Sequence, residues 1–404
     1  MRRSFRFVFL LVVVVVCLGP VAAQDTAVPE PIGLRPDAPP YAQHGPHWVG
    51  TTRIEAETPF HPTSVQIWYP ALNPDRLDEA VIYRAVGALS ASGHAIQDAQ
   101  PDSSGRPYPL VVLAHGLGVG NGFHAFVAEH LASQGFVVTA MDFADSGAMA
   151  QPSPAALTLY TRPRDVSWQL DFTEQLNADV SSFLYGMVDL EHVGIVGASL
   201  GGYTALVAGG AQLDLTGPTS WCAMHTDTIL QTRYCGRADA IAELAGLASV
   251  PDARWPSWAD TRIDVIVPLA PAAAFFGDES AQPIVLPALV MYGDSDRTVE
   301  SGDPLYRSYV FDNLGSETKV LVVLSDADHA IFNVECDSAP WIAEFGKFPA
   351  CSDPVWDMDR AHDLINHFTT AFLLSTLKSD SEATAALSPD AVAFPGIEYQ
   401  AEGF

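Results

Sequence analysis

A serine flanked by glycines is the clearest candidate for chemistry in this sequence. Residues 197–201 read Gly-Ala-Ser-Leu-Gly, after an apolar run at residues 192–196 and before a helix-like run. A strand, Gly-x-Ser-x-Gly and a helix in this order are typical of a nucleophilic serine held on a sharp turn. A Cβ at Gly197 or Gly201 would collide with the crowded backbone there. Ser199 is therefore predicted to be a nucleophile, the alternative being a glycine-rich turn with an idle serine.

Such a serine needs a histidine base and an acid that orients the base, and in this arrangement both follow it along the chain. Two aspartates, Asp294 and Asp296, follow an apolar run at residues 289–292. The carboxyl end of a parallel strand is where such folds place functional groups. Asp296 lies further along the loop, where the chain can turn back over the sheet. Asp294 can instead be interpreted as a residue that shapes the turn.

His329 is the histidine that the chain order selects. The sequence holds twelve histidines, so residue type alone selects none of them. His329 follows the apolar run at residues 319–324 and completes the order serine, aspartate, histidine. The alternative is an ordinary solvated histidine in a loop. Asp326 and Asp328 could replace Asp296 as the orienting acid, but they lie within three residues of the histidine, which is an awkward reach.

A glycine-rich segment after another apolar run predicts donors for an oxyanion. Residues 110–114 are apolar, and residues 115–118 read His-Gly-Leu-Gly. Backbone N–H groups are the usual donors, and glycines let the main chain approach the substrate closely. Because one donor normally belongs to the residue after the nucleophile, we expect Leu200 to supply one and Leu117 the other. His115 precedes the serine, so we expect it to brace the loop.

Alternating strands and helices must position these residues. Apolar runs predict strands at residues 110–114, 137–141, 192–196, 263–269, 289–292 and 319–324. Helices are expected at residues 123–134, within 165–188, at 203–208 and at 355–377. Two segments with alternating polarity predict antiparallel strands at residues 51–55 and 64–69, and residues 86–108 are expected to form a loop. This alternation indicates an α/β protein whose mostly parallel central sheet carries helices on both faces.

The three motifs in this order resemble the α/β-hydrolase fold. Residues 109–147 and 162–167 are similar to secreted dienelactone-hydrolase-like and platelet-activating-factor-acetylhydrolase-like esterases. The Gly-x-x-Asp spacing that ends at Asp296 resembles that of many hydrolases and favours this residue as the acid. True dienelactone hydrolases carry a cysteine where this chain has Ser199, which argues against their particular reaction. The acid comes one strand later than in the acetylhydrolases, as in cutinase-like polyester hydrolases.

The resemblance and the predicted triad together imply a serine carboxylic-ester hydrolase that acts on neutral esters through an acyl-enzyme. Polyester cleavage is one alternative, and amide or peptide hydrolysis on the same triad is another. A hydrolase fold used only for binding is disfavoured, because such proteins usually lose a triad member. No phosphate-binding, dinucleotide-binding or zinc-binding spacing stands out, so neither a cofactor nor a metal is expected.

The N-terminal residues resemble a secretory signal peptide. Three arginines precede the apolar run at residues 7–18, and Val-Ala-Ala ends at Ala23, which predicts cleavage there and a secreted or periplasmic protein. The run is too short to span a bilayer comfortably. Cys17 lacks the small preceding residue of a lipidation site, so no membrane anchor is expected. The net charge of −28 would repel nucleic acid, which is not an expected partner. The oligomeric state is left open.

Four cysteines follow the signal peptide, and an even number in an exported protein indicates two disulfides. Of the three formal pairings, proximity favours Cys222 with Cys235 and Cys336 with Cys351; the alternative is free buried thiols. The first pair lies in an insertion at residues 211–261, which is expected to form a cap over the site, the alternative being a surface excursion.

The chain is expected to have four parts, and the insertion lies within the third. These are the signal peptide at residues 1–23, a proline-rich lead-in at 24–46, the hydrolase domain at 47–378 and a C-terminal tail at 379–404.

Overall fold

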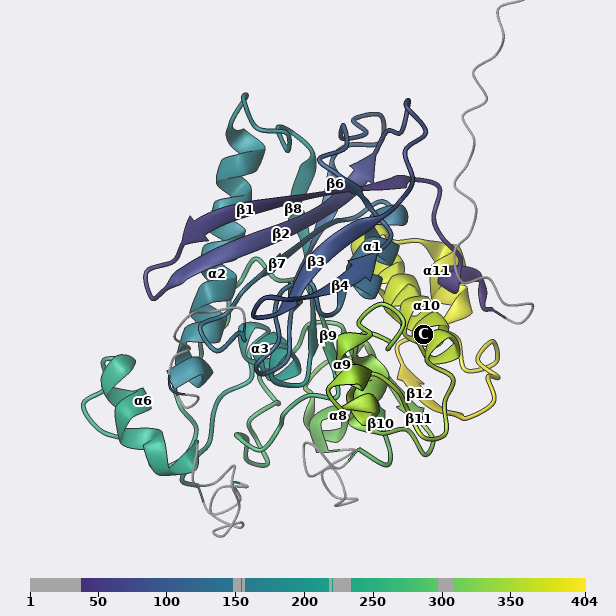
Figure 1. Cartoon of the computed structure of the whole chain (residues 1–404). Helices are drawn as coiled ribbons and strands as arrows, with labels where there is room; N and C mark the ends of the chain where they lie inside the picture. Colours follow the sequence, from purple (N-terminus) through teal and green to yellow (C-terminus); the bar gives the residue numbers. More distant parts are fainter. Residues whose placement is uncertain (1–37, 148–153, 155–156, 218–219, 221–233, 297–308) are drawn as a thin grey trace, which may run out of the picture.

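The centre of the molecule is a mostly parallel sheet, as predicted (Figure 1). The computed structural model describes residues 38–147, 154, 157–217, 220, 234–296 and 309–404. Within these residues the sheet has ten strands in the order β12–β11–β10–β9–β8–β6–β7–β2–β1–β5. The strands are β1 Trp48–Glu57, β2 Pro62–Ala71, β5 Ile96–Gln97, β6 Tyr108–Ala114, β7 Val137–Met141, β8 Val188–Ala198, β9 Val265–Leu269, β10 Ala288–Gly293, β11 Lys319–Leu324 and β12 Ile397–Glu402. The six strands from β7 to β11 in this order are parallel.

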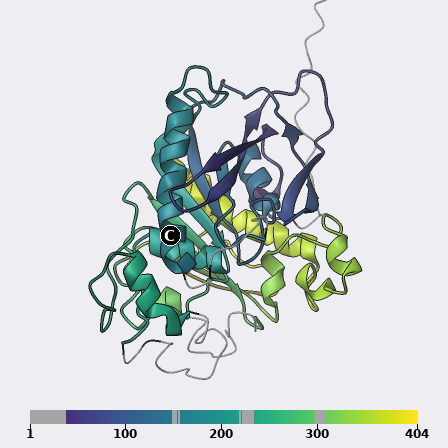
Figure 2. The ribbon, with the colours of Figure 1, turned by 60° about the vertical axis from the view of Figure 1, so that its left-hand side comes forward.

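Helices cover both faces of the sheet, which explains why its central strands are apolar throughout. Along β6, Leu110, Val112 and Ala114 join one core and Val111 and Leu113 join the other. Helices α2 Thr158–Ala178, α3 Leu200–Ala208, α6 Ala238–Leu244 and α8 Tyr309–Asn313 contribute to the first core. Helices α1 Ala125–Ser133, α10 Met358–Lys378 and α11 Ser381–Ala386 contribute to the second. Figure 2 shows α2 and the yellow α10 on opposite sides of the strands.

Three elements differ from the sequence-based expectation. The loop expected at residues 86–108 contains β4 Leu89–Gly93, which forms a hairpin with β3 Val81–Val86, and also β5. Helix α2 begins well before residue 165. The segment expected as a C-terminal tail supplies β12, which pairs antiparallel with all six residues of β11 and so completes one edge of the sheet.

Helix α2 contains a proline in its interior, and a side-chain hydroxyl replaces the N–H donor that this proline lacks. Pro163 has no N–H, which leaves the carbonyl of Leu159, four residues earlier, without its helical donor. The hydroxyl of Tyr203 on α3 donates to that carbonyl at 2.7 Å. The helix therefore continues through Pro163, and the same bond ties α2 to the helix that follows Ser199.

A buried carboxyl group fastens the β3–β4 hairpin to α1. Glu129 Oε1 accepts hydrogen bonds from the Tyr83 hydroxyl and from the His94 N–H, both at 2.7 Å. Trp68 Nε1 donates to the Tyr83 oxygen at 2.7 Å. Burial raises the pKa of Glu129 to about 8, so the carboxyl is protonated at neutral pH.

Glu129→Gln should weaken the dependence of stability on pH between about pH 5 and pH 8. The folded protein holds a proton on Glu129 over this range and the unfolded chain does not, so raising the pH lowers the free energy of unfolding. Glutamine has no proton to lose and keeps the acceptor oxygen. Thermal unfolding at a series of pH values measures the effect, with Glu398→Gln on the exposed face of β12 as the control. Parallel pH profiles for the wild type and Glu129→Gln would contradict the prediction.

Candidate active site

Ser199 occupies the sharp turn between β8 and α3. Its backbone angles are φ 57° and ψ −117°, a strained conformation for a residue with a side chain. Its N–H donates to Leu269 O at 2.9 Å, and its carbonyl accepts from Ala272 N–H at 3.0 Å, which fixes the turn on β9. A Cβ at Gly197 would overlap the carbonyl of Gly201, and one at Gly201 would overlap the carbonyl of Ala114. Glycine is required at both positions, as predicted.

An aspartate and a histidine meet at the ends of two neighbouring strands. His329 Nδ1 lies 2.6 Å from Asp296 Oδ2, the carboxylate is fully buried, and the imidazole is 13% exposed. Asp296 follows β10, and His329 begins the 3₁₀ turn η4 His329–Phe332 after β11. Since these strands are adjacent and parallel, their loops emerge at the same edge of the sheet.

The other aspartates of these loops have different contacts. Asp294 Oδ1 accepts the Asp326 N–H at 2.6 Å. This bond joins the loop after β10 to the loop after β11, so Asp294 has a structural contact there. Asp328 Oδ1 accepts the His329 N–H at 2.7 Å and caps the 3₁₀ turn. The structure thus brings Asp296 to the histidine ring, whereas the carboxylates of Asp294 and Asp328 bind backbone N–H groups.

Ser199 and His329 line one cavity of about 340 Å³, together with Leu117 and Leu200. A Cβ built on Gly116 would lie 3.5 Å from Ser199 Cβ, so the glycine-rich loop runs directly beside the serine. Leu200 is the first residue of α3, and N–H groups in the first turn of a helix have no partner within the helix. Among the contacts of the described residues, no hydrogen bond joins Ser199 Oγ to the His329 ring; such bonds are often long in unliganded enzymes.

His115 braces the glycine-rich loop, as predicted. Its Nε2 accepts the Phe143 N–H at 3.1 Å, so Nδ1 carries the proton and donates to Gly116 O at 2.7 Å. Burial, together with the charge of Arg162, lowers the pKa of His115 well below its ordinary value. The ring is therefore neutral and is held at both nitrogens.

The cavity is largely apolar. Its wall includes Phe123, Tyr234, Phe275 and Phe332. His124 also lines it, and its Nδ1 donates to Phe332 O at 2.9 Å. Burial lowers the pKa of His124 to about 4, so this histidine adds no charge at neutral pH. These aromatic residues were not predictable from the sequence, because buried aromatics in apolar segments carry no signal that distinguishes a cavity wall from a core.

Two peripheral segments reach the cavity. The insertion at residues 211–261 supplies Tyr234, while its Trp255 and Trp258 pack into the core beneath it. Its helix, α6, spans Ala238–Leu244. The Cys336–Cys351 disulfide is present, as predicted, and closes a segment that places Ala350 in the wall. The pairing of Cys222 with Cys235 lies outside the described residues, as does the signal peptide, and both stay predictions.

The described part of the chain contains neither a metal cluster nor a membrane-spanning helix. There, no group of three or more histidine, cysteine, aspartate or glutamate side chains could hold a metal ion. Over the same ranges, no helix is both long enough and apolar enough to cross a bilayer, and this includes the 21-residue α2 and α10.

Comparisons with known proteins point to ester hydrolases. The model of the family "Platelet-activating factor acetylhydrolase, isoform II" matches residues 71–155. The platelet-activating factor acetylhydrolase of Cavia porcellus is 26% identical over 220 residues, which cover 40% of this chain and 50% of that protein. The chain thus spans about half the length of this curated relative.

A solved structure extends the likeness over most of the chain. The ferulic acid esterase from Streptomyces cinnamoneus matches with a TM-score of 0.55 and 18% identity, covering 87% of this chain and 96% of that one. With its parallel sheet, its serine turn and its two flanking helix layers, the chain has the α/β-hydrolase fold.

Proposed function

We propose that this protein is a serine hydrolase that cleaves carboxylic esters through an acyl-enzyme. The observation that carries the proposal is the buried Asp296 carboxylate 2.6 Å from His329 Nδ1, beside a cavity that also contains the strained Ser199. A buried carboxylate bound to Nδ1 holds the other ring nitrogen as the free base that a serine hydroxyl needs. The similarity to an acetylhydrolase and to a ferulic acid esterase supports ester substrates.

The proposed reaction proceeds in two stages. His329 Nε2 takes the Ser199 proton as Oγ attacks the ester carbonyl, and the N–H groups of Leu117 and Leu200 bind the oxyanion. Asp296 stabilises the imidazolium, which then protonates the departing alcohol. Water activated by His329 hydrolyses the acyl-enzyme and frees Ser199.

The cavity favours a neutral substrate with an apolar or aromatic group. Its aromatic wall offers no formal charge to pair with an anion, and burial keeps His124 neutral. The net charge of −28 would also slow the approach of anionic substrates. The predicted signal peptide and the Cys336–Cys351 disulfide support action outside the cytoplasm.

Polyester cleavage is a second candidate. Leu117 is 44% exposed beside the cavity, and Phe348, two residues before the cavity-lining Ala350, is 58% exposed. These side chains could contact a polymer whose length exceeds the cavity. Release of soluble monomer from a polyester film tests this candidate separately.

A fluorophosphonate probe and a matched substrate panel test the main proposal. The purified protein should become labelled once, on the peptide that contains Ser199, with loss of ester cleavage in proportion to labelling. Short-chain p-nitrophenyl esters should be cleaved, and the corresponding p-nitroanilides much more slowly. Faster cleavage of the anilides would favour amide hydrolysis, and absence of labelling together with absence of turnover would overturn the proposal.

A further inference from the structure

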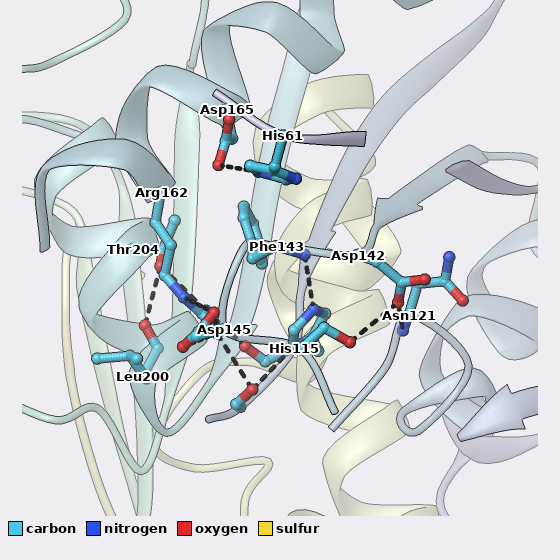
Figure 3. Close-up of polar contacts among 12 residues, drawn as sticks. His61, His115, Asn121, Asp142, Phe143, Asp145, Arg162, Asp165, Leu200 and Thr204 are labelled. Atoms are coloured by element: carbon cyan, nitrogen blue, oxygen red, sulfur yellow. Dashed lines mark hydrogen bonds and ion pairs between the residues drawn. The ribbon is translucent and has the colours of Figure 1, made fainter. Parts of the chain in front are cut away.

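A fully buried arginine lies beneath the glycine-rich loop. Arg162 of α2 is 0% exposed, and its Nε and Nη2 bond the Asp145 carboxylate at 2.9–3.1 Å (Figure 3). Its Cζ lies 4.4 Å from the centre of the Phe143 ring. The carboxylate and the aromatic face together fix the plane of the guanidinium, because a planar fork pairs with a carboxylate in one orientation.

Two further bonds of this arginine reach the loop, while Nη1 also donates to the Thr204 hydroxyl on α3 at 3.5 Å. Nη1 donates to His115 O at 2.7 Å, and Nη2 donates to Gly116 O at 3.2 Å. Gly116 O also accepts the proton of His115 Nδ1. Figure 3 shows Arg162 and Asp145 on one side of this loop and His115 within it. Two side-chain donors thus hold one peptide carbonyl in place.

The planarity of the peptide bond transmits this hold to Leu117. The carbonyl of Gly116 and the N–H of Leu117 belong to the same trans peptide unit, so they point in opposite directions. A carbonyl fixed toward Arg162 therefore turns the Leu117 N–H to the opposite side of the loop. The other proposed donor, Leu200 N–H, shares its peptide unit with Ser199 O, which the N–H groups of Ala272 and Tyr203 already hold.

We propose that Arg162 is a positioning residue that sets the direction of the Leu117 N–H for binding the oxyanion, with Asp145 orienting the guanidinium. This inference rests on the proposed ester hydrolysis. The competing interpretation is a buried ion pair that only stabilises the fold. The two differ in what a folded variant does: a positioning role affects the transition state, whereas a structural role affects unfolding alone.

Arg162→Lys is the first variant to measure. Lysine keeps the charge beside Asp145 but cannot hold the carboxylate and both loop carbonyls in one plane. We expect kcat for a p-nitrophenyl ester to fall on the order of 10²-fold, the loss expected for one oxyanion donor, with KM nearly unchanged. Affinity for a trifluoromethyl ketone, which forms a tetrahedral adduct with the serine, should fall by a similar factor.

A second variant removes both charges, because a single deletion would leave a buried charge unpaired and could unfold the protein. Arg162→Met combined with Asp145→Leu should fold, as judged by circular dichroism, and show the same loss of kcat and of ketone affinity. Arg262→Lys is the matched control. Arg262 also forms ion pairs, with Asp260, Asp171 and Glu174, but none of these residues lines the cavity, so the kcat of this variant should be unchanged.

The possible outcomes distinguish a failure of the positioning role of Arg162 from a failure of the proposed ester hydrolysis. If the wild type cleaves esters and folded Arg162→Lys or the double variant retains kcat and ketone affinity, the positioning role is wrong and the proposed function stands. If kcat is lost only in proportion to the unfolded fraction, the arginine is structural and the inference is also wrong. A wild type that is neither labelled nor active would overturn both.

Discussion

Ser199→Ala should lower kcat for a short-chain p-nitrophenyl ester on the order of 10⁶-fold, the scale of losing a triad nucleophile. The substitution removes only Oγ, and the backbone bonds that fix the turn, to Leu269 and Ala272, are unaffected. The fold should therefore persist, with a melting temperature close to that of the wild type. Stopped and continuous absorbance assays measure kcat, and circular dichroism measures stability.

A control variant and the residual activity of Ser199→Ala both test the assignment of the nucleophile. Ser181→Ala, an exposed serine that bonds Asp179, is the control and should retain full activity. Residual turnover in Ser199→Ala should remain above the rate in buffer, because oxyanion donors and substrate binding survive. Activity within tenfold of the wild type would show that another residue is the nucleophile.

Asp296→Asn should lower kcat on the order of 10⁴-fold with little change in the fold. An asparagine amide in place of the carboxylate can donate to His329 Nδ1, which favours the tautomer with the proton on Nε2. That tautomer cannot take a proton from Ser199. Steady-state kinetics and the rate of fluorophosphonate labelling should fall together, because both depend on the same base.

The chain offers a matched control two residues earlier. Asp294→Asn keeps the oxygen that accepts the Asp326 N–H, and that side chain has no role in the proposed proton transfer. Its kcat should stay within a few-fold of the wild type. If Asp294→Asn is the more damaging of the two, the assignment of the acid is wrong.

Strands that are buried on both faces were predictable from the sequence. The expected bounds of β7 and β11 agree with the structure, because an uninterrupted apolar run has the length of the buried strand itself. The meeting of Asp296 with His329 also followed from chain order, since both come directly after such runs. The apolar runs and the positions of Asp296 and His329 directly after them were therefore enough to predict this pair.

Elements that depend on partners far along the chain were not predictable. Residues 86–108 are small and polar, and β5 within this segment is a strand that pairs with the distant β1. A helix was expected within residues 165–188, whereas α2 begins at Thr158 and passes through Pro163, where a hydroxyl from α3 binds the freed carbonyl. Arg162, in the preceding position, was not predicted to have a role in the site. Its burial depends on Asp145 and Phe143, which no local pattern connects to it.

The bonds between the two loops at the edge of the sheet have a consequence for motion. Asp294 N–H bonds Leu324 O, Ser295 N–H bonds Ala327 O, and the Asp294 carboxylate bonds Asp326 N–H. We therefore expect the carboxylate and the imidazole to move together when thermal bending flexes β10 and β11. Ser199 is tied instead to the end of β9. We therefore expect fluctuations of the sheet to change the distance from Ser199 Oγ to the His329 ring more than the distance from Asp296 to that ring.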